Sequence, residues 1–241
     1  MNRFMLTQIL FIILSVACVY LIYQGLQHGL KSFDDKERKK INLRFVWTNI
    51  IWAVTLTGLS LSGFLNEFSM FPPRMFIVLV IPLFTVIFLT FSKTLTVILS
   101  GIPPAWLIYI QSFRIVVEVL LWILFLDNFL PIQMTFEGRN WDILVGITAP
   151  VIGYLCFYSG RYKRNLGIIW NILGLLLLLN IVIIAVLSMP TPARVFTNEP
   201  ANTIVATFPF VLLPGVLVPV AYTMHIFSLK QLLSNKNHPL R

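Results

Sequence analysis

Charged side chains are scarce in this sequence. They make up 11% of the 241 residues, whereas soluble globular domains carry about 25%. Hydrophobic residues make up 58% of the chain. No stretch between the apolar runs is long enough to form a second core. We therefore expect one all-α domain, spanning 1–241, that is embedded in a membrane.

Cysteine and histidine are scarce as well. The two cysteines, Cys18 and Cys156, fall inside apolar runs, where a thiol usually behaves as a small hydrophobe. The paired histidines of a transmembrane b-type haem, an HExxH-like metal motif and a GxxxxGK[ST] nucleotide loop are all missing. Lys230, the one lysine near the last apolar run, lies at its end and not at the depth that a retinal would need. We expect no enzyme activity, no cofactor and no metal.

Long apolar runs are abundant. A helix needs about 20 mainly apolar residues to cross a bilayer. The runs that qualify predict a bundle of seven transmembrane helices, at about 4–25, 44–64, 75–92, 104–129, 141–159, 166–188 and 203–229. The apolar segment 93–103 is too short and predicts a re-entrant or interfacial turn. The first run could instead be a signal peptide, but it continues to Leu26 and is longer than a signal core.

The basic residues predict the orientation. The formal net charge of +9 does not indicate nucleic acid, because the cations lie in short segments between apolar runs. Thirteen Lys and Arg residues lie in the odd connections and the C-terminal tail, against four in the N-terminus and the even connections. The positive-inside rule therefore places the C-terminus in the cytoplasm and the N-terminus outside. This layout suits a bacterial cytoplasmic (inner) membrane.

Two predicted outer loops resemble each other. Residues 69–76 read SMFPPRMF and residues 188–196 read SMPTPARVF, and both precede predicted helices with internal prolines. One interpretation is a 3+1+3 pseudo-repeat, in which the fourth helix joins two copies of a three-helix unit, as in some transporters. The alternative is that proline-rich turns recur by chance.

Arg114 and Glu118 are the most informative residues. Arg114 lies about 15 Å into the predicted fourth helix, near the bilayer centre, and Glu118 and Gln111 share its face. A central Arg costs roughly 2.5–3.5 kcal/mol and must face the bundle interior. The i,i+4 spacing predicts that Arg114 and Glu118 neutralise each other. The pair either locks the helix into the bundle or handles a solute, an ion or protons. Because desolvation can exceed the Coulombic gain, we favour the functional role.

A second polar cluster lies in the outer loop before the fifth predicted helix. It contains Glu137, Arg139, Asn140 and Asp142. Asn140 or Asp142 is suited to cap the helix that follows. Capping does not explain Glu137 with Arg139, which together could form a gate or a ligand clamp.

The seventh predicted helix contains three prolines. Each internal proline removes a backbone hydrogen bond, so a broken helix, whose exposed termini can bind ions, competes with a simple kink. The residues concerned are Pro209, Pro214, Gly215 and Pro219. Asn180 and His225 are secondary candidates. Asn180 and Asn171 lie on opposite faces of the sixth predicted helix, so we expect one of them to bond a neighbouring helix. We expect His225 to be interfacial or to bond a neighbouring helix, and not to converge with the carboxylates.

The favoured function is a transporter or channel for a small polar or charged solute. In this interpretation Glu118 couples passage to protons, Arg114 holds an anion or tunes Glu118, and the Pro214-Gly215 break supplies flexibility. The expected partners are membrane lipids, a small polar or anionic solute and protons. The alternative is a non-transporting sensor or accessory subunit that acts through its loops. A water-accessible path to the Arg114–Glu118 pair favours transport, whereas a dry, directly bonded pair favours the alternative.

Overall fold

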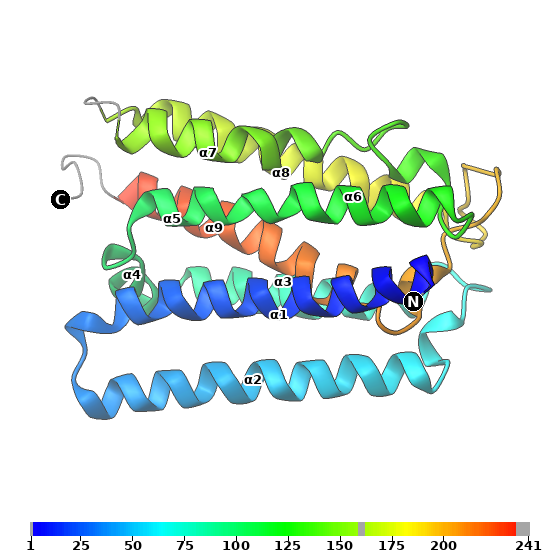
Figure 1. The fold of residues 1–241 in the computed structure, drawn as a ribbon. Coiled ribbons are helices and arrows are strands. Elements are labelled where there is room, and N and C mark those ends of the chain that lie inside the picture. Colours follow the sequence, from blue (N-terminus) through cyan, green and yellow to red (C-terminus); the bar gives the residue numbers. More distant parts are fainter. Residues whose placement is uncertain (1, 159–161, 235–241) are drawn as a thin grey trace.

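The computed structural model describes residues 2–158 and 162–234, which form an all-α bundle (Figure 1). The predicted fold class is confirmed in this respect. Arg161, Lys236 and Arg241, which contribute to the predicted orientation, lie outside the described residues. The α helices are α1 (Arg3–Gly29), α2 (Asp35–Leu61), α3 (Phe76–Thr90), α4 (Lys93–Ser100), α5 (Pro104–Tyr109), α6 (Phe113–Leu126), α7 (Ile143–Phe157), α8 (Arg164–Leu187) and α9 (Val218–Ser234).

Four helical segments are long and apolar enough to cross a membrane. They are Arg3–Ser32, Pro104–Leu126, Arg164–Leu187 and Leu213–Ser234. The α3–α4 pair becomes a fifth if it is counted as one span, although its two halves are bent by 82°. The described chain is therefore a helical protein with four or five candidate membrane spans.

Side-chain caps fix where the first two helices begin. Asn2 accepts a hydrogen bond from the backbone N–H of Phe4 at 2.7 Å and starts α1. Asp34 accepts one from the N–H of Glu37, also at 2.7 Å, and starts α2. Such caps satisfy N–H groups that have no partner within the helix. Because of the Asp34 cap, α2 begins well before the predicted boundary at residue 44 and includes the basic run.

The seventh predicted helix, 203–229, is wrong in its first part. Residues 203–212 contain only a short 3-10 turn, Ile204–Ala206, and a π-helix, Leu213–Leu217, precedes α9. Proline has no N–H to donate and interrupts the hydrogen bonds of a helix. Pro209 lies in residues 203–212, and Pro214 lies in the π-helix. The corresponding helix α3 is continuous through its own proline. The fold therefore does not show the duplicated unit that the two outer loops predicted.

Two long segments without α-helix occupy one end of the bundle, and they are longer than the loops predicted there. Residues 127–142 precede α7, and residues 188–212 precede the π-helix; both lie at the end that also holds the N-terminus (Figure 1). Helix α9 runs obliquely through the bundle and contacts α3, α5 and α8. This arrangement leaves room for polar side chains between α6, α7, α8 and α9.

Helix α2 lies at the edge of the bundle (Figure 1). Only Leu56 and Ser60 of α2 are buried. Trp52 donates from Nε1 to the carbonyl oxygen of Gly215 at 2.7 Å, and Ser60 donates from Oγ to the carbonyl oxygen of Ala206 at 2.8 Å. Residues 52, 56 and 60 share one helix face, so a single stripe attaches α2 to the segment before α9.

Two glycines give a matched test of this packing. An alanine Cβ at Gly146 in α7 would lie 2.8 Å from the backbone nitrogen of Ile115, whereas a Cβ at Gly58 in α2 would meet nothing within 4 Å. We expect Gly146→Ala to destabilise the protein by about 1–3 kcal/mol through overpacking. Gly58→Ala should instead stabilise it by up to about 1 kcal/mol through helix propensity. Thermal unfolding in detergent measures both, and equal effects would contradict the close α6–α7 approach.

Candidate functional site

Arg114 is the centre of a buried polar network. It lies in the first turn of α6, and only 1% of the residue is exposed. The Nε group donates to Oδ2 of Asp142 at 2.6 Å, and Nη2 donates to Oδ1 of the same carboxylate. This two-pronged geometry is the strongest that a guanidinium and a carboxylate can form. Because Asp142 directly precedes α7, the ion pair joins α6 to α7.

Glu118 is not the partner of Arg114, and the predicted i,i+4 pair is wrong. Asn140 Nδ2 lies 2.7 Å from both carboxylate oxygens of Glu118 and donates to them. Among the described residues, no Lys, Arg or His nitrogen lies within ion-pair distance of Glu118. A carboxylate from the facing segment aligns both oxygens with the guanidinium fork, and Asp142 therefore takes the place that Glu118 was predicted to occupy.

His225 extends the network to α9. Arg114 Nη1 lies 3.1 Å from His225 Nε2, and His225 Nδ1 lies 2.9 Å from Asn171 Oδ1. A guanidinium can only donate, so Nε2 accepts and the ring proton is on Nδ1. His225 is therefore neutral and donates to Asn171, which in turn donates to Ser228 Oγ at 3.0 Å. Among the described residues no hydrogen bond joins His225 to Glu118 or Asp142; Arg114 lies between His225 and Asp142.

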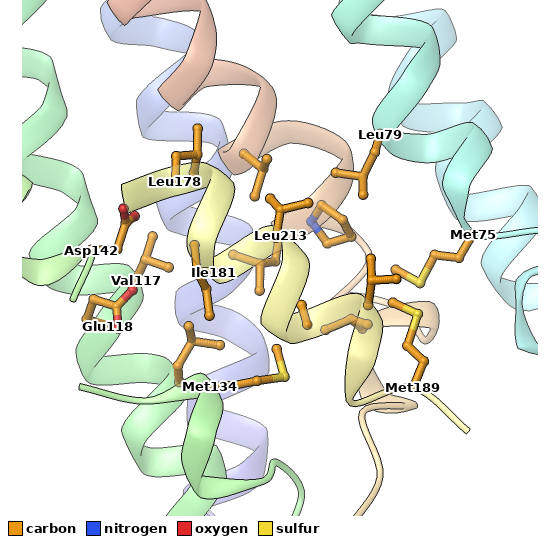
Figure 2. Close-up of a pocket in the computed structure, with 17 residues that line it drawn as sticks. Met75, Leu79, Val117, Glu118, Met134, Asp142, Leu178, Ile181, Met189 and Leu213 are labelled. Atoms are coloured by element: carbon orange, nitrogen blue, oxygen red, sulfur yellow. The ribbon is translucent and has the colours of Figure 1, made fainter. Parts of the chain in front are cut away.

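A cavity of about 70 Å³ lies beside this network. Figure 2 shows Glu118 and Asp142 at one side of the cavity and Met75, Leu79 and Met189 at the other. Its wall comes from α3, α6, α8, the π-helix, the start of α9 and the segments 127–142 and 188–212, and apart from the two carboxylates it is apolar. The volume is sufficient for several water molecules or for a small solute.

The ionisable groups that line the cavity are both carboxyl groups. Glu118 and Asp142 line the cavity, whereas Arg114 does not. The guanidinium faces Asp142 and His225 instead. Within residues 2–158 and 162–234, no three His, Cys, Asp or Glu side chains come together to hold a metal ion. The arrangement therefore suits a proton, a neutral group or an organic cation better than the anion that Arg114 was expected to hold.

The segments 127–142 and 188–212 form hydrogen bonds with each other beside the cavity. Gln133 donates from Nε2 to Ser188 Oγ at 2.8 Å and accepts from Asn198 Nδ2 at 2.7 Å. Met134 and Met189, which follow Gln133 and Ser188 in the chain, line the cavity. The segments 127–142 and 188–212 thus form a cover, held together by Gln133.

The predicted clamp of Glu137 and Arg139 is not formed. Glu137 is exposed and makes no hydrogen bond to any residue that the structure describes. Arg139 instead lies over the ring of Phe196, with Cζ 5.3 Å from the ring centroid, and its carbonyl oxygen accepts from Asn180 Nδ2 at 2.9 Å. Asn180 therefore bonds the cover and not a neighbouring helix.

Two carboxylates in the outer loops are held ionised. Hydrogen bonds from Ser69 keep the pKa of Glu67 below its ordinary value. Arg194 and the backbone N–H of Ala201 lower the pKa of Glu199 in the same way. Both acids therefore stay charged at neutral pH and hold their loops in place at this end of the bundle.

The proline positions lie around the π-helix. Pro209 precedes it and Pro219 follows it, while Pro214 and Gly215 are within it. Pro214 lines the cavity. Gly215 is packed closely enough that a Cβ there would lie 2.6 Å from Leu56 Cδ1. The predicted weak point of this helix therefore forms part of the cavity wall.

Several polar side chains near Arg114 bond differently from what the sequence predicted. Gln111 was expected to join Arg114, but it donates from Nε2 to the carbonyl oxygen of Ala221 at 2.9 Å and so bonds α9. Asn140 or Asp142 was expected to cap α7. The side chain of Asn140 accepts from the backbone N–H of Asp142, the residue before α7, and the side chain of Asp142 makes no capping hydrogen bond. Asn171 bonds Ser228 and His225 of α9, as one of the two asparagines of the sixth predicted helix was expected to do. The signal that was missed is a set of isolated buried polar residues: Gln133, Ser188, Asn202 and Ser228.

The buried ion pair gives a test against an exposed one. Asp142→Asn leaves Arg114 without its carboxylate in an apolar interior, and breaking such a pair costs about 3–5 kcal/mol. The control is Asp127→Asn, which removes the ion pair with the exposed Arg3; we expect little change because exposed pairs contribute little. Thermal unfolding of both variants in the same detergent checks this. Similar melting temperatures for Asp142→Asn and the parent would contradict the assignment.

A family model matches residues 72–233, well over half of the chain. No curated protein and no solved structure matches the chain. The matched range contains helices α3 to α8, α9 except its last residue, the cavity and every residue of the Arg114 network, whereas α1 and α2 lie before it. The chain therefore belongs to the family described as "Domain of unknown function (DUF8737)".

Proposed function

We propose that the protein crosses a bacterial inner membrane seven times, with its N-terminus outside and its C-terminus in the cytoplasm. The distribution of Lys and Arg supports this orientation. Helix α2, with 27 residues, is about 40 Å long and therefore long enough to cross. Helix α7 has 15 residues, about 22 Å, so residues 127–142 complete its crossing. The cover over the cavity is then on the outer side.

We further propose that the protein binds a small solute in the cavity beside Glu118 and passes it across the membrane. The observation that carries this proposal is the buried Glu118 carboxyl in the wall of a cavity that is apolar apart from Glu118 and Asp142. An ionisable group inside a membrane is costly and is usually retained for function. Non-helical backbone at membrane depth is tolerated where it lines a cavity, and both outer segments do so.

The π-helix supports movement of the cavity wall. Single-turn π-helices are often found at functional sites, and proline with glycine weakens the local hydrogen-bond ladder. Pro214 lies in this turn and also lines the cavity. A change in the π-helix would therefore alter the cavity directly, as passage of a solute requires.

A second candidate is a sensor or accessory subunit that binds the solute without passing it. Arg114 is dry and bonded directly to Asp142 and His225, and the cover is closed by Gln133. Both observations favour a binding module. An enzyme is disfavoured, because both ring nitrogens of His225 are engaged away from the cavity.

A cavity-filling substitution tests solute binding. Ala185 lines the cavity, and Ala53 is exposed on α2. We expect Ala185→Phe to abolish binding and uptake of a small solute, whereas Ala53→Phe should leave both unchanged. The probes are choline, 3,3-dimethyl-1-butanol and 3,3-dimethylbutanoate, which have similar shapes and carry positive, zero and negative charge. Binding is measured by calorimetry in nanodiscs, and uptake of the charged probes in proteoliposomes.

Each outcome of this experiment separates the candidates. Binding with uptake, both lost in Ala185→Phe, supports transport. Binding without uptake supports the sensor or accessory subunit. Absence of binding for all three probes, or binding that Ala185→Phe does not alter, would overturn the assignment of the cavity as a solute site.

A further inference from the structure

The charges around Glu118 do not balance when its carboxyl group is ionised. The charged or titratable groups near it are Arg114 from α6, Asp142 before α7 and His225 from α9. Arg114 and Asp142 neutralise each other, and His225 is neutral because it accepts from Arg114. The cavity walls supplied by α3, α8 and the π-helix are apolar. An ionised Glu118 would therefore leave the cluster with one uncompensated negative charge.

Hydrogen bonding alone does not compensate for that charge. Glu118 is 1% exposed, and Asn140 is its only hydrogen-bond donor among the described residues. Burial of an unpaired carboxylate is far more costly than burial of a neutral, hydrogen-bonded group. The cluster therefore requires one more positive charge. In the empty cavity that charge is a proton on Glu118.

We propose that the cavity binds a small organic cation in exchange for this proton. This inference rests on the proposed solute site and names its ligand class. The positive group lies against the Glu118 carboxylate, and its apolar substituents contact side chains such as Met134 and Leu178. On binding, the O–H bond of Glu118 breaks, the electron pair stays on the carboxylate and the proton leaves to water. One positive charge replaces another, so the charge of the cluster is unchanged.

The same charges disfavour other ligand classes. An anion would meet Glu118 and Asp142, because Arg114 does not line the cavity. A neutral molecule of the same shape would gain the apolar contacts and no ion pair. The methionines Met75, Met134 and Met189 are flexible and polarisable, and they suit methyl or methylene groups attached to a cationic nitrogen.

The experiment compares choline with its neutral isostere, 3,3-dimethyl-1-butanol, and with 3,3-dimethylbutanoate. Choline carries a permanent charge and cannot itself take up or release the exchanged proton. Calorimetry of the full chain in nanodiscs, in two buffers of different ionisation enthalpy, counts the protons released per choline bound. We expect one proton, and a choline affinity that rises about tenfold per pH unit while the empty site is protonated.

Glu118→Gln keeps the shape of the protonated acid and cannot be ionised. We expect it to weaken choline binding by about thirtyfold or more, to abolish the pH dependence and to leave binding of the neutral isostere unchanged. The matched control is Glu137→Gln, because Glu137 is exposed on the cover; it should bind choline as the parent does. If Glu118→Gln does not fold, infrared difference spectra of the parent supply the second readout: choline should remove the C=O band of a protonated carboxylic acid.

The outcomes distinguish this inference from the proposed function. If the neutral isostere binds as tightly as choline and Ala185→Phe abolishes both, the cavity is a solute site and cation–proton exchange is wrong. Choline binding without proton release, or a carboxylic-acid band that choline leaves unchanged, also overturns the exchange. If none of the three probes binds, the solute site itself is wrong and the inference fails with it.

Discussion

A guanidinium group cannot be left unpaired in the apolar interior of this bundle. Arg114 loses its hydration on burial. The protein has to replace that water with hydrogen-bond acceptors and a negative charge of its own. Asp142 supplies the charge and His225 a further acceptor. To do so, α7 has to begin beside the first turn of α6, and α9 has to cross obliquely near the same point. The short α7 and the long segment before it follow from this requirement.

The burial of Arg114 could be predicted from the sequence, but its partner could not. The cost of a charge at membrane depth requires an inward side chain whatever the rest of the fold. The i,i+4 spacing then offers Glu118 as a local partner. Asp142 is 28 residues away along the chain, and its proximity depends on how residues 127–142 return to the bundle. No local periodicity contains that information.

The helices show the same division between local and tertiary information. The apolar runs predict the positions of α1, α3, α8 and the α5–α6 segment closely, because hydrophobicity over some 20 residues decides them. The prolines predict a weak point before α9, but not that residues 203–212 leave the helix and cover the cavity. That cover depends on the bonds of Gln133 with Ser188 and Asn198. Polar residues of this kind look the same in a sequence whether they face water or each other.

The bond between Arg114 and His225 has a consequence for the movement of protons. An arginine side chain stays protonated in proteins and has no acceptor, so it cannot relay a proton from one neighbour to the next. His225, with Nε2 committed to Arg114 and Nδ1 to Asn171, has no free ring nitrogen on the carboxylate side. Arg114 therefore prevents proton transfer between His225 and Asn171 on one side and the two acids on the other. A proton on Glu118 therefore does not come from His225 by way of Arg114.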